Sequence, residues 1–413
     1  MSTALKPKDG TRYWFKLLLP FVISFGLTIP GLWAELTHAE ISPVVGMFAF
    51  GGAVVAGAFV LGWISEAAEL DLRGGLSIAL LAVIAILPEY VVDFYFAFAA
   101  GKDPSMAAYA SANLTGANRL LLGFGWPAMA IFGYFAIRSM NKKAKQEFPK
   151  FGVSLESEAR VDLAFLMVAS AIALIVPITH QFDLFTGAAL VILFALYLIR
   201  ISQQDKEEPE LEGIPALVGN LPKLGRRIFL FITAVLAAFV IIVVAEPFAH
   251  SLIEAGKALN IDEFILVQWL APLASEAPEF IVAIMFALRG KPAIGLAILV
   301  SSKVNQWTAL AGSLPIGYAL GGGQGALPMD AVQVEEFTLT IAQTLFGVAI
   351  LLSLRLGLLD AVALITLFSI TLVFPDPNIR IWVAMVYFAI ALPLFIYRWR
   401  ELGQTLKAPF IRT

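Results

Sequence analysis

The chain has 413 residues, of which 59% are hydrophobic and 14% are charged, and its formal net charge is -3. Soluble domains carry about 25% charged residues, so this chain has too few charged side chains to cover a water-soluble globule. The near-neutral charge gives no indication of a nucleic-acid partner, and the lack of cysteine excludes disulfides and thiol chemistry. The composition predicts an all-α polytopic membrane protein that lies in a lipid bilayer.

Twelve stretches are long and apolar enough to cross a bilayer, whose core requires about 20 residues of helix. The first, Trp14–Leu36, is longer than the apolar core of about 7–15 residues in a cleaved signal peptide, so we expect it to be retained. In chain order the segments are approximately 14–36, 42–66, 76–100, 106–138, 160–178, 183–200, 226–249, 262–289, 293–320, 335–355, 358–375 and 379–398. The fourth is too long for a straight crossing, and its glycines and Pro127 favour a bend or a tilt.

Lysine and arginine are distributed unequally between the two sides that these segments define. Twenty-three of the 28 lie on the side of both termini, whereas only Lys102, Lys257 and Arg380 lie on the opposite side. The remaining two, Arg119 and Lys303, lie inside segments. Because basic residues accumulate on the cytoplasmic side, we expect both termini in the cytoplasm and the protein in the plasma (inner) membrane.

Two stretches of the sequence resemble each other. Leu87-Pro88-Glu89 lies inside the third segment and Ala277-Pro278-Glu279 inside the eighth. Five crossings separate the two copies, an odd number, so they are predicted to have opposite orientations. Inverted repeats with broken helices are typical of secondary transporters. We therefore expect a first half, 1–200, with its repeat at 42–138; a cytoplasmic linker, 201–225; and a second half, 226–413, with its repeat at 226–320.

The two glutamates are the strongest candidates for binding a substrate. Glu89 lies about twelve residues from either end of its segment, close to the bilayer centre, where an ionised side chain is costly unless it meets a partner or water. Pro88 and Pro278 each remove a backbone donor and are expected to break their helices, which frees carbonyl oxygens. Carboxylate and carbonyl oxygens together favour calcium, sodium or a proton over a soft metal.

Each glutamate is accompanied by a second acid. Asp93 lies four residues after Glu89, and Glu276 lies three residues before Glu279, so each pair shares one helix face. Four carboxylates in apolar surroundings cannot all be ionised without counter-charge. We therefore expect cation binding to displace protons from these acids, which would couple cation movement to proton movement.

The segment after each glutamate carries polar residues inside an apolar stretch. They are Asn113, Thr115, Asn118 and Arg119 in the first half, and Ser301, Ser302, Lys303, Asn305 and Gln306 in the second. Amides and hydroxyls at such positions are interpreted either as cation ligands or as hydrogen bonds between helices. The two basic residues are interpreted either as ion-pair partners of the acids or as tethered cations that take the place of a bound ion.

At these residues the sequence resembles the calcium/cation antiporter superfamily, which includes the sodium/calcium and proton/calcium exchangers. The resemblance rests on Leu87-Pro88-Glu89 with Asn113–Asn118, and on Ser275–Glu279 with Ser301–Asn305. It implies that Glu89 and Glu279 are the central cation ligands and that the site is exposed alternately to the two sides. It also implies a carrier without a resident cofactor, whose transported cations bind only transiently.

Two departures from the family pattern bear on the transported ions. Family members often have hydroxyl residues three and four places before the glutamate, but the first repeat has Ala85 and Ile86 there, and the second has Ser275 and Glu276. Arg119 and Lys303 are also unusual near a cation site. With fewer sodium ligands and two basic residues nearby, these departures favour sodium/proton or proton/calcium exchange over exchange of three sodium ions for one calcium ion.

The function expected from the sequence is a secondary-active antiporter that exchanges sodium and/or protons for calcium or another cation. The alternatives are a sodium/proton antiporter without calcium transport, a cation channel, or a membrane-embedded enzyme. The sequence lacks a His-Glu-x-x-His motif and an evident nucleophile constellation, which argues against an enzyme. It also lacks a Walker sequence, which argues against a primary pump, and acids at the centre of both halves favour a carrier over a channel.

Overall fold

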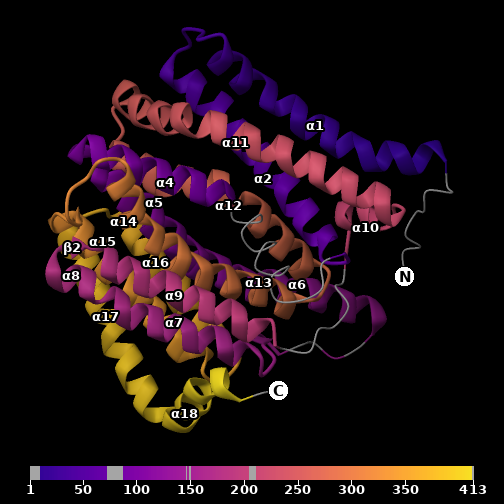
Figure 1. Cartoon of the computed structure of the whole chain (residues 1–413). Helices are drawn as coiled ribbons and strands as arrows, with labels where there is room; N and C mark the ends of the chain where they lie inside the picture. The colour runs from indigo at the N-terminus through magenta and orange to yellow at the C-terminus, as the bar shows by residue number, and fades with distance from the viewer. Residues whose placement is uncertain (1–9, 72–86, 146, 148–149, 204–210, 412–413) are drawn as a thin grey trace. The chain divides into compact units, whose positions relative to one another are not determined.

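The computed structural model describes residues 10–71, 87–145, 147, 150–203 and 211–411. The described chain consists almost entirely of helices, with four strands of two residues each. The helices are α1 Thr11–Leu36, α2 Pro43–Ala68, α4 Leu87–Lys102, η2 Pro104–Met106, α5 Ala107–Leu120, η3 Leu121–Gly125, α6 Trp126–Ala144, α7 Ala159–Ala173, α8 Ile175–Thr179, α9 Leu184–Ile201, α10 Ile214–Gly219, α11 Lys223–Leu259, α12 Glu263–Leu288, α13 Pro292–Asn305, η4 Gln306–Leu310, α14 Ala311–Leu320, α15 Ala331–Leu351, α16 Leu358–Val373, α17 Pro377–Tyr397, α18 Trp399–Lys407 and η5 Ala408–Phe410 (Figure 1).

The predicted all-α membrane architecture is confirmed. Within the described residues, nine helices are long and apolar enough to span a bilayer, and α16 is a shorter apolar helix. The third predicted segment, 76–100, lies partly outside the described residues, because α4 is described only from Leu87. The expected number of twelve crossings therefore stays a prediction.

The chain forms two compact units, and each takes residues from both halves of the sequence. Unit 1 comprises 1–95 and 198–278, and unit 2 comprises 96–197 and 279–413. The chain passes from one unit to the other within α4, α9 and α12.

Unit 1 is built around α2, which packs against α1 and α11. Apolar side chains such as Phe21, Leu61 and Ile241 form its core. Because lipid tails are as apolar as these side chains, close van der Waals packing between the helices, rather than removal from water, supplies the main stabilising contribution. Two polar contacts secure one end of the unit. The Tyr13 hydroxyl donates to the Leu217 carbonyl at 2.7 Å, and the Arg226 guanidinium donates to the Asp71 carboxylate at 2.6 Å.

Unit 2 is organised around α15, which packs against α5, α7 and α17, while α13 packs against α6 and α7. Two short antiparallel strand pairs connect loops of this unit by hydrogen bonds. One joins β1 (Val153–Ser154) to β4 (Arg355–Leu356), and the other joins β2 (Gln181–Phe182) to β3 (Leu327–Pro328).

Both repeats contain the same local irregularity. The helix after each Pro-Glu motif includes five residues of π-helix, η3 after α5 and η4 after α13. Pro127 and Pro315 then follow in α6 and α14. π-Helical turns leave the regular ladder of backbone hydrogen bonds and often occur at functional sites. Each π turn begins within three residues of a buried basic residue, Arg119 in the first repeat and Lys303 in the second.

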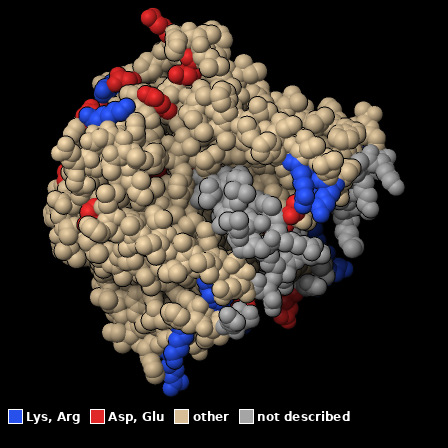
Figure 2. Space-filling view, in the orientation of Figure 1, with Lys and Arg blue, Asp and Glu red and all other residues tan. Residues whose placement is uncertain are grey.

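The described surface agrees with a lipid environment. Large apolar side chains are exposed along several spanning helices, for example Phe231 on α11 and Trp382 on α17. Figure 2 shows that neither acidic nor basic side chains cover most of the visible face, and that the charged ones occur in small groups. An apolar exterior of this extent is expected where lipid takes the place of water.

Candidate cation site

The first predicted pair of acids lies on α4 in unit 1. Glu89 is 4% exposed and Asp93 is 1% exposed, one helical turn apart. Pro88 is the second residue of the described part of this helix. The residues before Leu87 lie outside the described part of the chain, so the expected helix break at Pro88 stays a prediction. Both acids are nevertheless withdrawn from solvent, as expected of side chains that bind an ion or a proton.

The second motif lies on α12. Ser275 and Glu276 are buried in unit 1, and the Ser275 hydroxyl donates to the carbonyls of Ala271 and Pro272, both at 3.3 Å. This helix continues through Pro278 to Leu288. The predicted break at Pro278 is therefore a missing backbone donor within a continuous helix, and the helix does not end there.

Glu279 lies at the start of the second part of unit 2. Its carboxylate lies near the hydroxyl of Ser302 on α13, although that hydroxyl makes no hydrogen bond within the described part of the chain. Ser302 is 8% exposed and Asn305, one turn further along, is 6% exposed. Unit 2 therefore brings Glu279 together with one of the hydroxyl residues predicted as a cation ligand.

Lys303 links the two repeats within unit 2. Its side chain is fully buried, and its ammonium donates to the main-chain oxygen of Asn118 at 3.0 Å and to the Asn118 side-chain oxygen at 3.2 Å. The Asn118 amide nitrogen donates to the Leu114 carbonyl at 3.0 Å. Both ends of the Asn118 amide are thus engaged by protein groups in this conformation, and an ammonium lies beside two oxygens of the kind that bind a cation.

Arg119 belongs to a buried cluster of three charges. Its guanidinium lies 2.7 Å from one carboxylate oxygen of Glu336 on α15, and Arg380 on α17 lies 3.1 Å from the other. The side chains of Arg119, Glu336 and Arg380 are 1%, 0% and 5% exposed. Of the two sequence interpretations, the structure shows the ion pair for Arg119, although its partner is Glu336, which was not among the predicted acids.

The remaining predicted residues also lie in unit 2. Asn113 is 2% exposed on α5, and the Ser301 hydroxyl on α13 lies 2.9 Å from the Tyr197 hydroxyl on α9. Within either unit of the described chain, no three acidic or histidine side chains gather as a metal ion would require. A cation held by these residues would therefore need carbonyl, amide, hydroxyl or water oxygens in addition to carboxylates.

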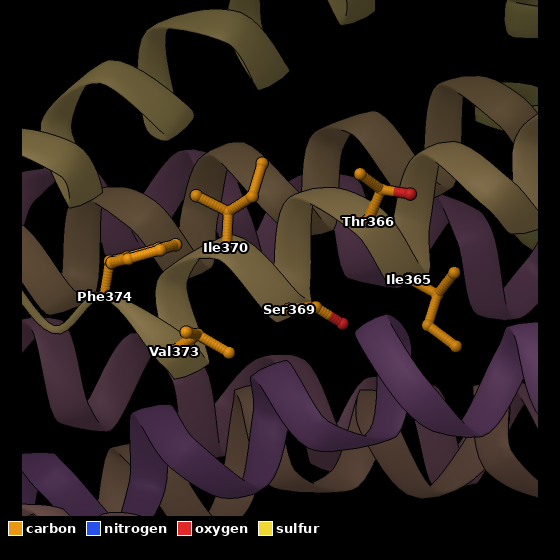
Figure 3. Close-up of a pocket in the computed structure, with 6 residues that line it drawn as sticks. All are labelled: Ile365, Thr366, Ser369, Ile370, Val373 and Phe374. Atoms are coloured by element: carbon orange, nitrogen blue, oxygen red, sulfur yellow. The ribbon is translucent and has the colours of Figure 1, made fainter.

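A separate shallow groove of about 340 Å³ runs along one face of α16 (Figure 3). No ionisable side chain lines it, and two hydroxyl groups are its only polar side chains, so it is not a candidate cation site. The residues that line it are Ile365, Thr366, Ser369, Ile370, Val373 and Phe374.

Comparison with known proteins identified a family and several related structures. The family model described as sodium/calcium exchanger protein matches residues 42–202 and 229–399. The crystal structure of the H+/Ca2+ exchanger CAX superposes on the chain with a TM-score of 0.89. The two sequences are 36% identical, and the match covers 97% of this chain and 98% of that one.

Two more distant structures share the fold. YfkE has a TM-score of 0.60 at 15% identity, and the match covers 89% of this chain and 99% of that one. A structure of the sodium-calcium exchanger NCX_Mj has a TM-score of 0.50 at 17% identity, with coverage of 80% and 98%. At these identities the likeness concerns the fold alone. Among curated proteins, no match was found.

Proposed function

The chain belongs to the sodium/calcium exchanger family and is a cation antiporter, and we propose that it exchanges calcium for protons across the membrane. The observation that carries this proposal is the 36% identity to the H+/Ca2+ exchanger CAX over 97% of the chain. The replacement of family hydroxyls by Ala85 and Ile86 in the first repeat supports protons over sodium as the counter-ion, because it leaves fewer neutral oxygen ligands for a sodium ion.

In this proposal, Glu89 and Glu279 are the principal ligands of the transported cation. Asp93 and Glu276 also bind and release the transported protons, because each lies on the same helix face as one of these glutamates. Calcium prefers several oxygen ligands at about 2.3–2.6 Å, and carboxylates must be ionised to provide its strongest ones. Calcium binding therefore releases protons from the acids, and reprotonation on the other side releases calcium.

We assign Asn113, Ser275, Ser301, Ser302 and Asn305 as further oxygen ligands or as supports of the principal ones. All five are polar residues of the two repeats, and all but the partly buried Ser301 are buried. Asn118 is engaged by Lys303 in this conformation, so we propose that it contributes to cation binding only when that contact opens. The Lys303 ammonium then acts as a tethered cation that keeps one subsite closed to a second ion.

We further propose that transport proceeds by alternating access and that the protein lies in the plasma (inner) membrane with both termini in the cytoplasm. The proposed orientation follows from the excess of basic residues on one side of the predicted segments. In the same proposal the two halves, 1–200 and 226–413, are inverted repeats joined by a cytoplasmic linker at 201–225. Inorganic cations and lipid are then the partners of the chain.

The test is calcium uptake by liposomes that contain the purified protein. Vesicles are loaded at low pH without sodium and diluted into radioactive calcium at higher pH, so that only an outward proton gradient is present. We expect concentrative uptake that a protonophore abolishes. Uptake driven only by an outward sodium gradient would assign the chain to sodium/calcium exchange, and proton movement driven by sodium without calcium would make it a sodium/proton antiporter.

A further inference from the structure

A carboxyl group outside the two repeats lies within a spanning helix. Asp162 stands in the first turn of α7, and the Tyr197 hydroxyl on α9 donates to its Oδ1 atom at 2.6 Å. Tyr197 is 2% exposed and packs its ring against Phe165. An ionisable residue inside a membrane helix is costly and commonly functional, yet neither Asp162 nor Tyr197 was among the residues predicted from the repeats.

The same tyrosine hydroxyl connects Asp162 to a candidate cation ligand. The Tyr197 oxygen lies 2.9 Å from the Ser301 hydroxyl, and Ser301 immediately precedes Ser302, whose hydroxyl lies near the Glu279 carboxylate. Asp162, Tyr197 and Ser301 therefore form a hydrogen-bonded relay across α7, α9 and α13. All three residues belong to unit 2.

The direction in which the hydroxyl groups of this relay donate their hydrogen bonds depends on whether Asp162 is protonated. A tyrosine hydroxyl has a single hydrogen to donate. When Asp162 is ionised, Tyr197 donates to it, Ser301 donates to Tyr197, and the free lone pairs of Ser301 point away from the relay. When Asp162 is protonated, it can donate to Tyr197, and Tyr197 then donates to Ser301. The Ser301 hydrogen is turned outward in that case, which makes Ser301 a poorer ligand for a cation.

We infer that Asp162 and Tyr197 are positioning residues that set the cation affinity of the transport site through Ser301. The inference rests on the proposed function. It gives Asp162, which lies outside both repeats, a role in coupling calcium movement to proton movement. An ionised Asp162 favours the loaded site and a protonated Asp162 favours the empty one. This is the sense required for calcium and protons to compete.

Three of the charged groups on α7 and the neighbouring helices are engaged outside this relay. Lys303 bonds to Asn118, Glu336 pairs with Arg119 and Arg380, and the Arg160 guanidinium on α7 donates to Leu352, Glu401 and Thr405. Besides Asp162, α7 and the helices that pack most closely against it or carry Tyr197 have these charged residues: Arg160 on α7, Arg200 on α9, Lys303 on α13, Glu335 and Glu336 on α15, and Arg400, Glu401 and Lys407 on α18. The hydrogen bond from Tyr197 is the direct polar contact through which we propose that Asp162 acts.

The experiment compares Tyr197→Phe, Asp162→Asn and the double variant with the unaltered protein in liposomes. Calcium KM and maximal rate are measured at several pH values, and calcium-dependent thermal stabilisation in detergent gives a binding readout without transport. We expect each single variant to raise the calcium KM about three- to tenfold, which corresponds to the net free energy of about one hydrogen bond. The maximal rate should change less than about twofold, and the pH dependence of KM should flatten.

The double variant separates a relay from general damage. Because Asp162 acts through Tyr197, the double variant should match Tyr197→Phe alone, whereas independent effects would add. Tyr134→Phe, which removes a hydroxyl from the same unit outside the relay, should leave KM unchanged. An unchanged KM in Tyr197→Phe, or additive effects in the double variant, would overturn the inference.

The two hypotheses fail in different ways. Failure of the unaltered protein to move calcium would overturn the proposed function itself, and the inference with it. Normal calcium/proton exchange with variants that behave like the unaltered protein would overturn the inference alone. Should Asp162→Asn not fold, the KM shift and the flattened pH profile of Tyr197→Phe still decide the outcome.

Discussion

The ammonium of Lys303 donates to both the main-chain and the side-chain oxygen of Asn118, at 3.0 and 3.2 Å, and so joins the two sequence repeats inside unit 2. A positive charge thereby occupies a position beside two oxygens in the helix that follows the first Pro-Glu motif. In the proposed mechanism, the Lys303 ammonium repels a second cation and keeps Asn118 from binding one.

Replacing Lys303 by methionine should therefore raise the affinity of the transport site for cations. We expect the calcium KM to fall about tenfold, equivalent to about 1.4 kcal/mol, because one nearby positive charge is removed. We also expect sodium to become a competitor. Calcium uptake at varied calcium and sodium concentrations checks this. The exposed Lys257 on α11 provides the control, Lys257→Met, and identical kinetics in both variants would mean that Lys303 has only a structural role.

The central glutamates should be indispensable for exchange. Glu89→Gln and Glu279→Gln each keep the shape of the side chain but remove the charge that attracts calcium and the group that carries the proton. We expect calcium uptake to fall by more than about 100-fold, which corresponds to about 2.7 kcal/mol, while the size-exclusion profile is retained. Glu254→Gln on the exposed face of α11 is the control, and near-normal exchange in either glutamate variant would refute the assignment of that residue.

The cluster of Arg119, Glu336 and Arg380 should contribute to stability. Glu336→Gln removes the charge of the carboxylate that pairs with both buried guanidinium groups, so we expect a loss of about 3–5 kcal/mol. The neighbouring Glu335 is more exposed, and Glu335→Gln should change stability by less than about 0.5 kcal/mol. Thermal unfolding in detergent measures both, and equal melting temperatures for the two variants would contradict a stabilising role.

The contact between Arg226 and Asp71 predicts a specific pH dependence. The hydrogen bond from Arg226 lowers the pKa of the Asp71 carboxyl below its ordinary value. A lowered folded-state pKa contributes stability that is present above the unfolded-state pKa of about 4 and is lost as the pH falls through the folded-state value. Asp71→Asn should therefore lower the melting temperature at pH 7, and the difference from the unaltered protein should shrink below about pH 4. A constant difference across that range would show that the charge of Asp71 does not matter.

The sequence predicted the all-α membrane fold and its relationship to the exchangers, because both depend on long apolar runs and on paired motifs. It was less accurate at helix ends. The seventh segment was expected to end near residue 249, but α11 continues to Leu259, since the less apolar residues that follow still form a helix. The two π-helical turns were not predicted, because hydrophobic periodicity does not distinguish one extra residue in a turn from a regular helix.

The contacts between polar side chains on different helices of unit 2 were the hardest features to predict. Glu336 and Asp162 lie near the starts of their segments, where an acid would ordinarily be solvated, and Tyr197 lies in a run that reads as apolar. Pairing across helices depends on tertiary packing, which a single sequence does not specify. An acid near the start of an apolar segment, together with a basic residue inside another, is a signal that could have suggested the Arg119 and Glu336 pair.

The most direct test of calcium/proton exchange is the luminal pH of proteoliposomes when calcium is added outside in the complete absence of sodium. If calcium enters in exchange for protons, the lumen becomes more alkaline in the unaltered protein and stays constant in Glu279→Gln. A lumen whose pH does not change while calcium still enters, or calcium entry that requires internal sodium, would contradict the account.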